Sequence, residues 1–294
     1  MAHSHALLGA GTTPAEITVR RIGVADLKDA LRRGLDDFQA MPTHAMFLCV
    51  IYPVIGLLLA RLAFGYSVLP LLYPMAAGFA LVGPVAALGL YELSRRREAG
   101  LDSSASHAFD VMQSSSIGGI ALMSLLLLVI FVFWMAAANA IYIANFGYAT
   151  PASIPHFIDS VFTTRAGWTL IVVGNLVGLL FAILALTVSV VSFPLMLDRD
   201  VGAAVALHTS IKAVAQNPVT IGIWGLIVAA LLIAGSLPFF LGLTVVVPVL
   251  GHATWHLYRR LVVADAGAPP TQYDRPRGRR FAADFPAVLF PWAK

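Results

Sequence analysis

The sequence predicts an all-α polytopic membrane helix bundle, with six transmembrane helices in three hairpins and amphipathic helices at the interface. Hydrophobic residues make up 59% of the 294-residue chain, charged residues only 12%, and the mean hydropathy is +0.83. Soluble domains carry about 25% charged residues, so this composition suits a lipid-facing surface. The apolar residues also gather into long runs, and the basic residues fall almost entirely on one side of them.

Six stretches are long and apolar enough to cross a bilayer. A helix needs about 20 apolar residues to span the hydrocarbon core, and such stretches lie at 45–64, 69–93, 117–144, 168–197, 219–237 and 239–262. A weak internal repeat groups them in pairs, because the second and sixth stretches both contain a proline beside valine, at Pro84 and Pro248. We therefore expect three hairpins.

The lysine and arginine residues predict the orientation of the bundle. All of them except Arg61 and Arg165 lie before the first span, between spans two and three, between spans four and five, or after span six. Short loops rich in Lys and Arg remain in the cytoplasm. This distribution predicts an even number of spans and places both termini in the cytoplasm.

Outside the spans, the sequence predicts amphipathic helices and two flexible ends. In residues 24–41, apolar residues recur every three or four positions, from Val24 to Phe38, and leave the charged residues, including Asp36 and Asp37, largely on the other faces. A second such helix, 201–216, ends at Asn217-Pro218, and a weaker one covers 103–113. The expected layout is a disordered N-terminus (1–19), a cytoplasmic amphipathic helix (20–43), a membrane domain (44–263) and a flexible basic tail (264–294).

Few residues suggest chemistry. His252 and His256 lie four residues apart, on one helix face, and are weak candidates for binding a cofactor. The competing interpretation places His256 at the membrane interface beside Tyr258. We find no catalytic residues, no metal-binding pattern and no P-loop or dinucleotide-binding motif, so the sequence predicts no cofactor and leans against an enzyme.

Polar and proline residues within the spans are the remaining candidates. Asn139 and Asn175 are expected to make polar contacts between helices of the bundle. Glu92, at the inner end of span two, can pair with Arg95 or Arg96 one turn away. Helix kinks are expected at Pro53, Pro84, Pro194 and Pro248. Transporters use such broken helices to build binding sites, although prolines also shape purely structural bundles.

Several motifs resemble a known family. They are Asp26-Leu-Lys-Asp-Ala-Leu-Arg-Arg-Gly-Leu-Asp-Asp-Phe, Tyr52-Pro-Val-Ile-Gly, Gly83-Pro-Val-Ala-Ala-Leu-Gly-Leu-Tyr-Glu-Leu-Ser-Arg-Arg and Ser192-Phe-Pro-Leu-Met-Leu-Asp-Arg. Over residues 20–265, the chain is similar to a bacterial family of integral membrane proteins called domain of unknown function 2189. The resemblance implies the bacterial inner membrane and no defined activity. Some members are labelled putative cytochrome c oxidase subunit I, but this chain has no adjacent histidine pair.

Three functional hypotheses remain. The favoured one is a non-enzymatic membrane scaffold, assembly factor or partner subunit, because buried charges are few and amphipathic helices could contact other membrane proteins. The alternative is a transporter of small molecules or lipids, and the third is a haem-binding or oxidase-related protein. The expected partners are the lipid bilayer, anionic lipids at the basic tail and other membrane proteins, with no nucleic acid.

Overall fold

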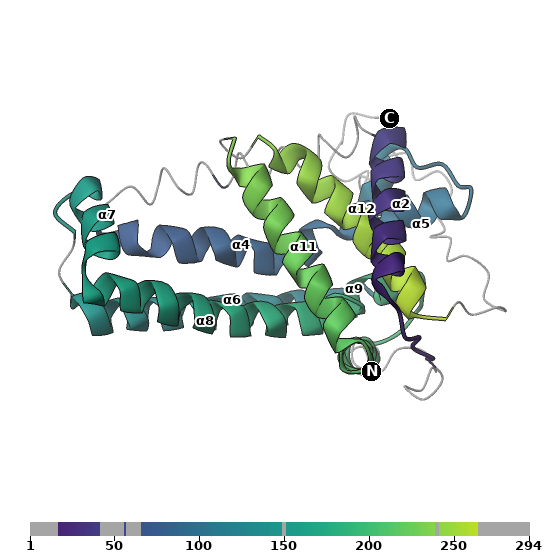
Figure 1. Ribbon diagram of the computed structural model, residues 1–294. Helices are drawn as coiled ribbons and strands as arrows, with labels where there is room; N and C mark the ends of the chain where they lie inside the picture. The colour runs from purple at the N-terminus through teal and green to yellow at the C-terminus, as the bar shows by residue number, and fades with distance from the viewer. Residues whose placement is uncertain (1–16, 42–55, 57–65, 149–150, 239–240, 264–294) are drawn as a thin grey trace, which may run out of the picture.

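The protein is mainly helical over the residues that the computed structural model describes, which are 17–41, 56, 66–148, 151–238 and 241–263 (Figure 1). The helices are α2 (Val24–Ala40), η2 (Tyr66–Leu71), α4 (Leu72–Ala86), α5 (Leu88–Glu98), η3 (Ala105–Gln113), α6 (Ile117–Phe146), α7 (Ile154–Thr163), α8 (Arg165–Ser189), α9 (Ser192–Asp198), α10 (Ala203–Gln216), α11 (Pro218–Ser236) and α12 (Leu243–Leu261). An antiparallel bridge joins Val19 to Val262. The predicted all-α class is confirmed.

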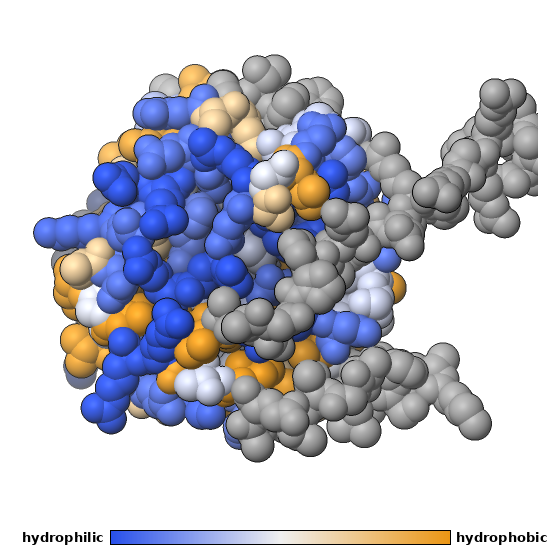
Figure 2. Space-filling view, turned by 90° about the vertical axis from the view of Figure 1, so that its right-hand side faces the viewer, coloured by the Kyte–Doolittle hydropathy of each residue, from blue (hydrophilic) through white to orange (hydrophobic). Residues whose placement is uncertain are grey.

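Figure 1 shows two parts, which we call the stalk and the head. The stalk consists of α4, α6 and α8, which run side by side, with α7 across the far end. The head gathers α2, α5, α9 and the end of α12 at the opposite end, and α11 crosses obliquely between them. Seen from the head end, the surface is mostly hydrophilic (Figure 2).

Trp134 of α6 holds the stalk together. Its indole N–H donates to the carbonyl of Pro74 in α4 at 2.8 Å, and its ring packs against Phe181 of α8 with the centroids 5.8 Å apart. Gly178 gives the ring its space, since a Cβ there would lie 3.0 Å from Trp134. The remaining inward side chains of α6, such as Met123 and Leu127, are also buried. Apolar packing therefore joins the three helices.

Three helices in the described part of the chain are long and apolar enough to cross a membrane: α6, α11, and α8 taken together with α9. In the apolar stretch of each of these helices, most residues are not covered by the rest of the protein, as expected for helices that face lipid. The first predicted span, 45–64, lies almost wholly outside the described residues, as do the predicted flexible ends. The second is divided among η2, α4 and α5, and the sixth corresponds to α12.

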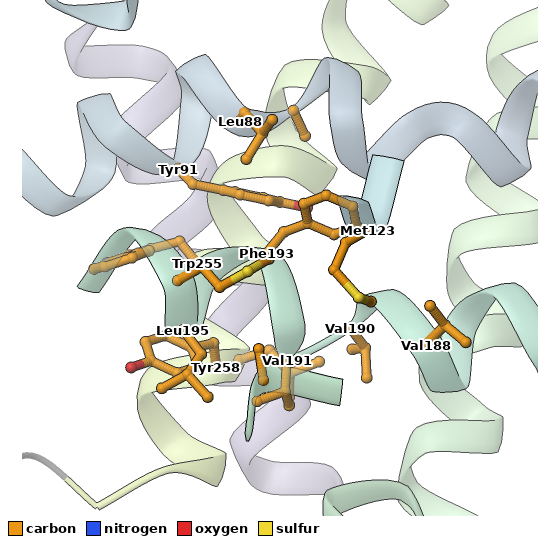
Figure 3. Close-up of a cluster of buried hydrophobic side chains, with 14 of the residues drawn as sticks. Leu88, Tyr91, Met123, Val188, Val190, Val191, Phe193, Leu195, Trp255 and Tyr258 are labelled. Atoms are coloured by element: carbon orange, nitrogen blue, oxygen red, sulfur yellow. The ribbon is translucent and has the colours of Figure 1, made fainter. Parts of the chain in front are cut away.

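The core where stalk and head meet is drawn in Figure 3. Side chains from five helices converge there, and Phe193 and Leu195 of α9 are fully buried. The helical chain is interrupted at Val190 and Val191, between α8 and α9, and Val190 lies four residues before Pro194. Because Pro194 has no N–H to donate to Val190, the chain can turn at this point. The turn carries α9 into the head.

The predicted amphipathic helices exist. The 24–41 prediction corresponds to α2, the 201–216 prediction to α10, and the 103–113 prediction to the 3₁₀ helix η3. The Asn217-Pro218 break separates α10 from α11 as expected, with Pro218 in the first turn of α11. The apolar face of α2, however, packs against α12 within the head.

Gly34 brings α2 and α12 into close contact. A Cβ at this position would lie only 2.6 Å from the backbone nitrogen of Ala253 and 2.7 Å from its Cβ. Only glycine allows such an approach, because any side chain would push the two helices apart. This glycine lies on the buried face of α2, three residues before Asp37.

We expect Gly34→Ala to destabilise the protein by about 1–3 kcal/mol, the usual cost of overpacking a tight contact. The matched control is Gly222→Ala on α11, where a new Cβ would meet nothing within 4 Å. Thermal unfolding of the two purified variants in detergent checks the prediction. Equal midpoints for the two variants would contradict the close contact between α2 and α12.

Candidate buried polar site

A buried carboxylate, Asp37 of α2, lies at the centre of the head. Its side chain accepts a hydrogen bond from the hydroxyl of Ser94 in α5 at 2.6 Å and one from Nε2 of His256 in α12 at 2.8 Å. The guanidinium of Arg97 in α5 binds its other oxygen. Asp37 is only 4% exposed, so these partners replace the water that a carboxylate needs.

The second histidine of α12 belongs to the same cluster. Nδ1 of His252 lies 2.7 Å from the Ser94 hydroxyl and 4.0 Å from Asp37. Among the described residues, Nε2 of His252 finds no hydrogen-bond partner of ordinary geometry. The two candidate histidines of the sequence thus meet at one carboxylate, together with Ser94. We call Asp37, Ser94, Arg97, His252 and His256 the Asp37 cluster.

The pKa of the Asp37 carboxyl reflects this environment. Burial alone would raise it, but the hydrogen bonds from His256 and Ser94 and the charges of the histidines outweigh that effect. The pKa therefore lies below the ordinary value of 3.8. Asp37 remains ionised in the folded protein at neutral pH, and the cluster is held by charge-assisted hydrogen bonds.

The arrangement does not match a nucleophilic triad. In such a triad the carboxylate orients the histidine from the ring nitrogen opposite the serine. Here Asp37 and His252 both contact the serine hydroxyl, and Ser94 is 1% exposed. The geometry instead supports a structural role, in which a buried polar network joins α2, α5 and α12.

A second network connects α5 to η3. Glu92 is fully buried and forms two hydrogen bonds of 2.8 Å with Arg95, while Arg96 reaches Asp110 of η3 at 3.3 Å. His107 of η3 also contacts Asp110, at 2.6 Å. The pairing of Glu92 with Arg95 follows the three-residue spacing that the sequence predicted.

A third network joins α12 to α5 and α9. The hydroxyl of Tyr258 donates to Asp198 at 2.5 Å, and Arg259 contacts both Asp198 and Glu98. Glu98 also accepts from the indole N–H of Trp255 at 2.9 Å. Arg95 and Arg96 of α5 and Arg259 of α12 are therefore bound to carboxylates of this chain.

Part of the chain matches the model of a known protein family. Residues 71–198 match the family described as predicted integral membrane protein (DUF2189). The resemblance predicted from the sequence is thereby confirmed for these residues. No curated protein and no solved structure matches the chain.

The DUF2189 match covers α4 to α9, and so includes Ser94, Arg97 and the Glu92 network. Asp37, His252 and His256 lie outside it, on α2 and α12. The Asp37 cluster therefore joins the matched segment to helices that come before and after it in the sequence.

The structure places the other candidate residues apart from this cluster. Asn139 and Asn175 lie on exposed faces of α6 and α8, and Asn175 accepts a hydrogen bond from the hydroxyl of Tyr73 at 2.8 Å. Pro84 lies within α4, and Pro248 lies within an unbroken α12. Pro53 is outside the described residues. Among the residues with described positions, no group of three or more His, Cys, Asp or Glu side chains could hold a metal ion.

Sequence reasoning missed Asp37. The helical pattern assigned it to a polar face of an interfacial helix, but the structure places it on the buried side of α2, in contact with α12 and α5. One signal was present in the sequence: Gly34, Asp37 and the apolar Leu27 and Ala30 all share the buried side of α2. A carboxylate on a face that also carries glycine and alanine could have indicated a buried contact.

We expect Asp37→Asn to destabilise the protein by about 3–5 kcal/mol, because it removes the charge that His256 and Arg97 contact in a buried setting. Asp36→Asn is the matched control, since Asp36 is the exposed neighbour on the same helix. The thermal midpoints of the two variants in detergent test this. An equal effect of both substitutions would show that the cluster adds no stability.

The lowered pKa of Asp37 also predicts a pH dependence. A carboxyl whose pKa is lower in the folded state contributes stability above its ordinary value of 3.8, and this contribution is lost as the pH falls through the folded-state pKa. The stability difference between wild type and Asp37→Asn should therefore be constant near neutral pH and shrink below that value. Unfolding midpoints measured from about pH 7 to about pH 2 check it. A difference that stays unchanged throughout would contradict the ionised state of Asp37.

Proposed function

We propose that this protein is a non-enzymatic partner or assembly subunit of the bacterial inner membrane, with six spans and both termini in the cytoplasm. Its stalk is embedded in the bilayer, and its head is a rigid platform on the cytoplasmic surface. The basic tail, residues 264–294, lies outside the described residues, and we propose that it contacts anionic lipids.

The observation that carries this proposal is an exposed apolar pair on the head. Phe109 and Met112 of η3 are 63% and 71% exposed, whereas His107, Ala108, Asp110 and Val111 on the other side of η3 are buried. The Glu92 network holds η3 firmly on α5. A rigidly held pair of large apolar side chains on a hydrophilic head suits contact with another protein.

The paths of α4 and α12 support six spans. The chain enters α4 from η2, which contacts α6, and leaves it into α5 of the head, so α4 runs the length of the stalk. The start of α11 and the end of α12 both meet residues 17–23, since Asn217 bonds to Ile22 and Arg20 bonds to Leu261. The departure of α11 from that point and the return of α12 to it support a hairpin for this pair.

Cysteine labelling tests the topology. In a Cys49→Ser background, Ala152→Cys before α7 should react with a membrane-impermeant maleimide in intact cells. Ser106→Cys on η3 should react only after the membrane is permeabilised. Both positions are exposed, so access and not burial decides the outcome. Labelling of Ser106→Cys in intact cells would overturn the proposed orientation.

Native electrophoresis of mildly solubilised membranes tests the role as a partner subunit. We expect the wild-type chain to migrate in a larger assembly, and the Phe109→Ser/Met112→Ser variant to migrate with the purified protein. The control is Val24→Ser/Leu35→Ser, which changes two exposed apolar residues of α2. Migration of the wild type at the size of the purified protein would contradict the proposal.

One observation favours the transporter alternative. The hydrogen bond between Tyr73 and Asn175 places two polar side chains on an exposed face of the stalk, at a depth where lipid offers no partner. If this pair belongs to a transport path, Asn175→Leu should abolish lipid or solute movement in proteoliposomes. If the pair is structural, Asn175→Leu should only lower the thermal midpoint.

A further inference from the structure

Residues 17–23 form a strap across the corner between α10 and α11. The side chain of Asn217 accepts a hydrogen bond from the N–H of Ile22 at 2.8 Å and donates to the carbonyl of Arg20 at 3.0 Å. The hydroxyl of Thr220 donates to the carbonyl of Ile22 at 3.0 Å. The N–H of Arg20 bonds to Leu261 at the end of α12. The strap is therefore fixed to the first turn of a candidate membrane span.

The strap carries positive charge that no carboxylate in the described part of the chain neutralises. Arg20 and Arg21 are both exposed, and among the described residues no carboxylate pairs with either side chain. The ammonium of Lys212 on α10 lies beside the strap, where it donates to the carbonyl of Ile17 at 3.3 Å. Among the described residues, the nearest acid along the chain is Asp26, which caps the N–H of Gly23 and faces Arg260.

This differs from the rest of the head. The arginines on α5 and at the end of α12 have carboxylate partners within this chain: Arg95 with Glu92, Arg96 with Asp110, Arg97 with Asp37, Arg259 with Glu98 and Asp198, and Arg260 with Asp29. Within the described ranges, acids thus pair with most arginines of the head, but with neither of the two on the strap. Cationic side chains without a carboxylate partner, beside a membrane span, attract an anion from outside the protein.

The surroundings of the strap identify the source of that anion as lipid. Val219, in the first turn of α11, is 73% exposed, and Ile211 on α10 is also exposed. These apolar side chains continue into the uncovered apolar surface of α11 at Leu226 and Ile233. Cationic groups at the edge of a lipid-facing surface lie at the level of the phosphate groups, which arginine side chains can reach by snorkelling.

We propose that Arg20 and Arg21, together with Lys212, bind the phosphate groups of anionic phospholipids in the leaflet on the head side. The site is distinct from the basic tail and independent of any protein partner of the head. It anchors the strap, and through Asn217 it holds the corner where α11 enters the membrane. Bound lipid and the hydrogen bonds of Asn217 therefore reinforce each other.

The test uses the full-length protein, purified in a neutral detergent, and fluorescent phosphatidylglycerol and phosphatidylcholine with identical chains. We expect the wild type to prefer phosphatidylglycerol, and Arg20→Gln/Arg21→Gln to weaken its binding by at least about fivefold, since each charge near a phosphate contributes to the attraction. Arg20→Lys/Arg21→Lys keeps both charges and should retain most of the binding. Matched thermal midpoints in phosphatidylcholine confirm that the variants are folded.

The control variant is Lys28→Gln/Arg32→Gln, which removes two exposed charges from α2 and leaves the strap intact. The tail is the same in every variant, so differences report the strap alone. An equal loss in both double glutamine variants would overturn the site, because it would reflect net charge only. Full displacement of the lipid by an equal concentration of inorganic phosphate, or by an acidic peptide, would also overturn it in favour of a soluble anion or a protein.

Discussion

The head depends on the burial of one ionised carboxylate. Removing Asp37 from water is costly, and the cost is offset only if Ser94, His256 and Arg97 meet it together. Hydrogen bonds are directional, so this requirement fixes both the rotation and the axial position of α2 against α12 and α5. Gly34, one turn earlier, allows the backbones close enough for these bonds to form. The close contact and the buried charge are therefore two parts of one constraint.

The stalk and the head are stabilised by different physics. In the stalk, apolar side chains pack around Trp134, and the outward faces stay apolar because lipid surrounds them. In the head, carboxylates and arginines satisfy one another in networks that link α5, α9, η3 and α12. Water at the head surface allows such polar residues, and the networks hold the ends of the membrane helices in defined positions. The strap at α11 is held by the same kind of polar contacts, through Asn217 and Thr220.

The predictable parts of the structure are those that depend on neighbouring residues. The break at Asn217-Pro218 follows from the missing N–H of proline, and the contact of Glu92 with Arg95 follows from their spacing on one helix. The Asp37 cluster is different, because Asp37 and His256 are separated by 219 positions in the sequence. A charge pattern along one helix says which residues share a face, but not which other helix covers that face.

The sequence by itself determined that the protein is helical, that it belongs in a membrane and where its amphipathic helices lie, because these depend on composition and on the local period of apolar residues. The tertiary structure decided what covers each helix face. It buried Asp37 on the packed side of α2, brought His252 and His256 to that carboxylate and paired arginines such as Arg97 and Arg260 with acids from another helix. It also left Arg20 and Arg21, at the foot of α11, without a carboxylate partner among the described residues. The physical reason is that the free energy of a charged group depends on its neighbours in space, which the order of residues along a chain does not specify.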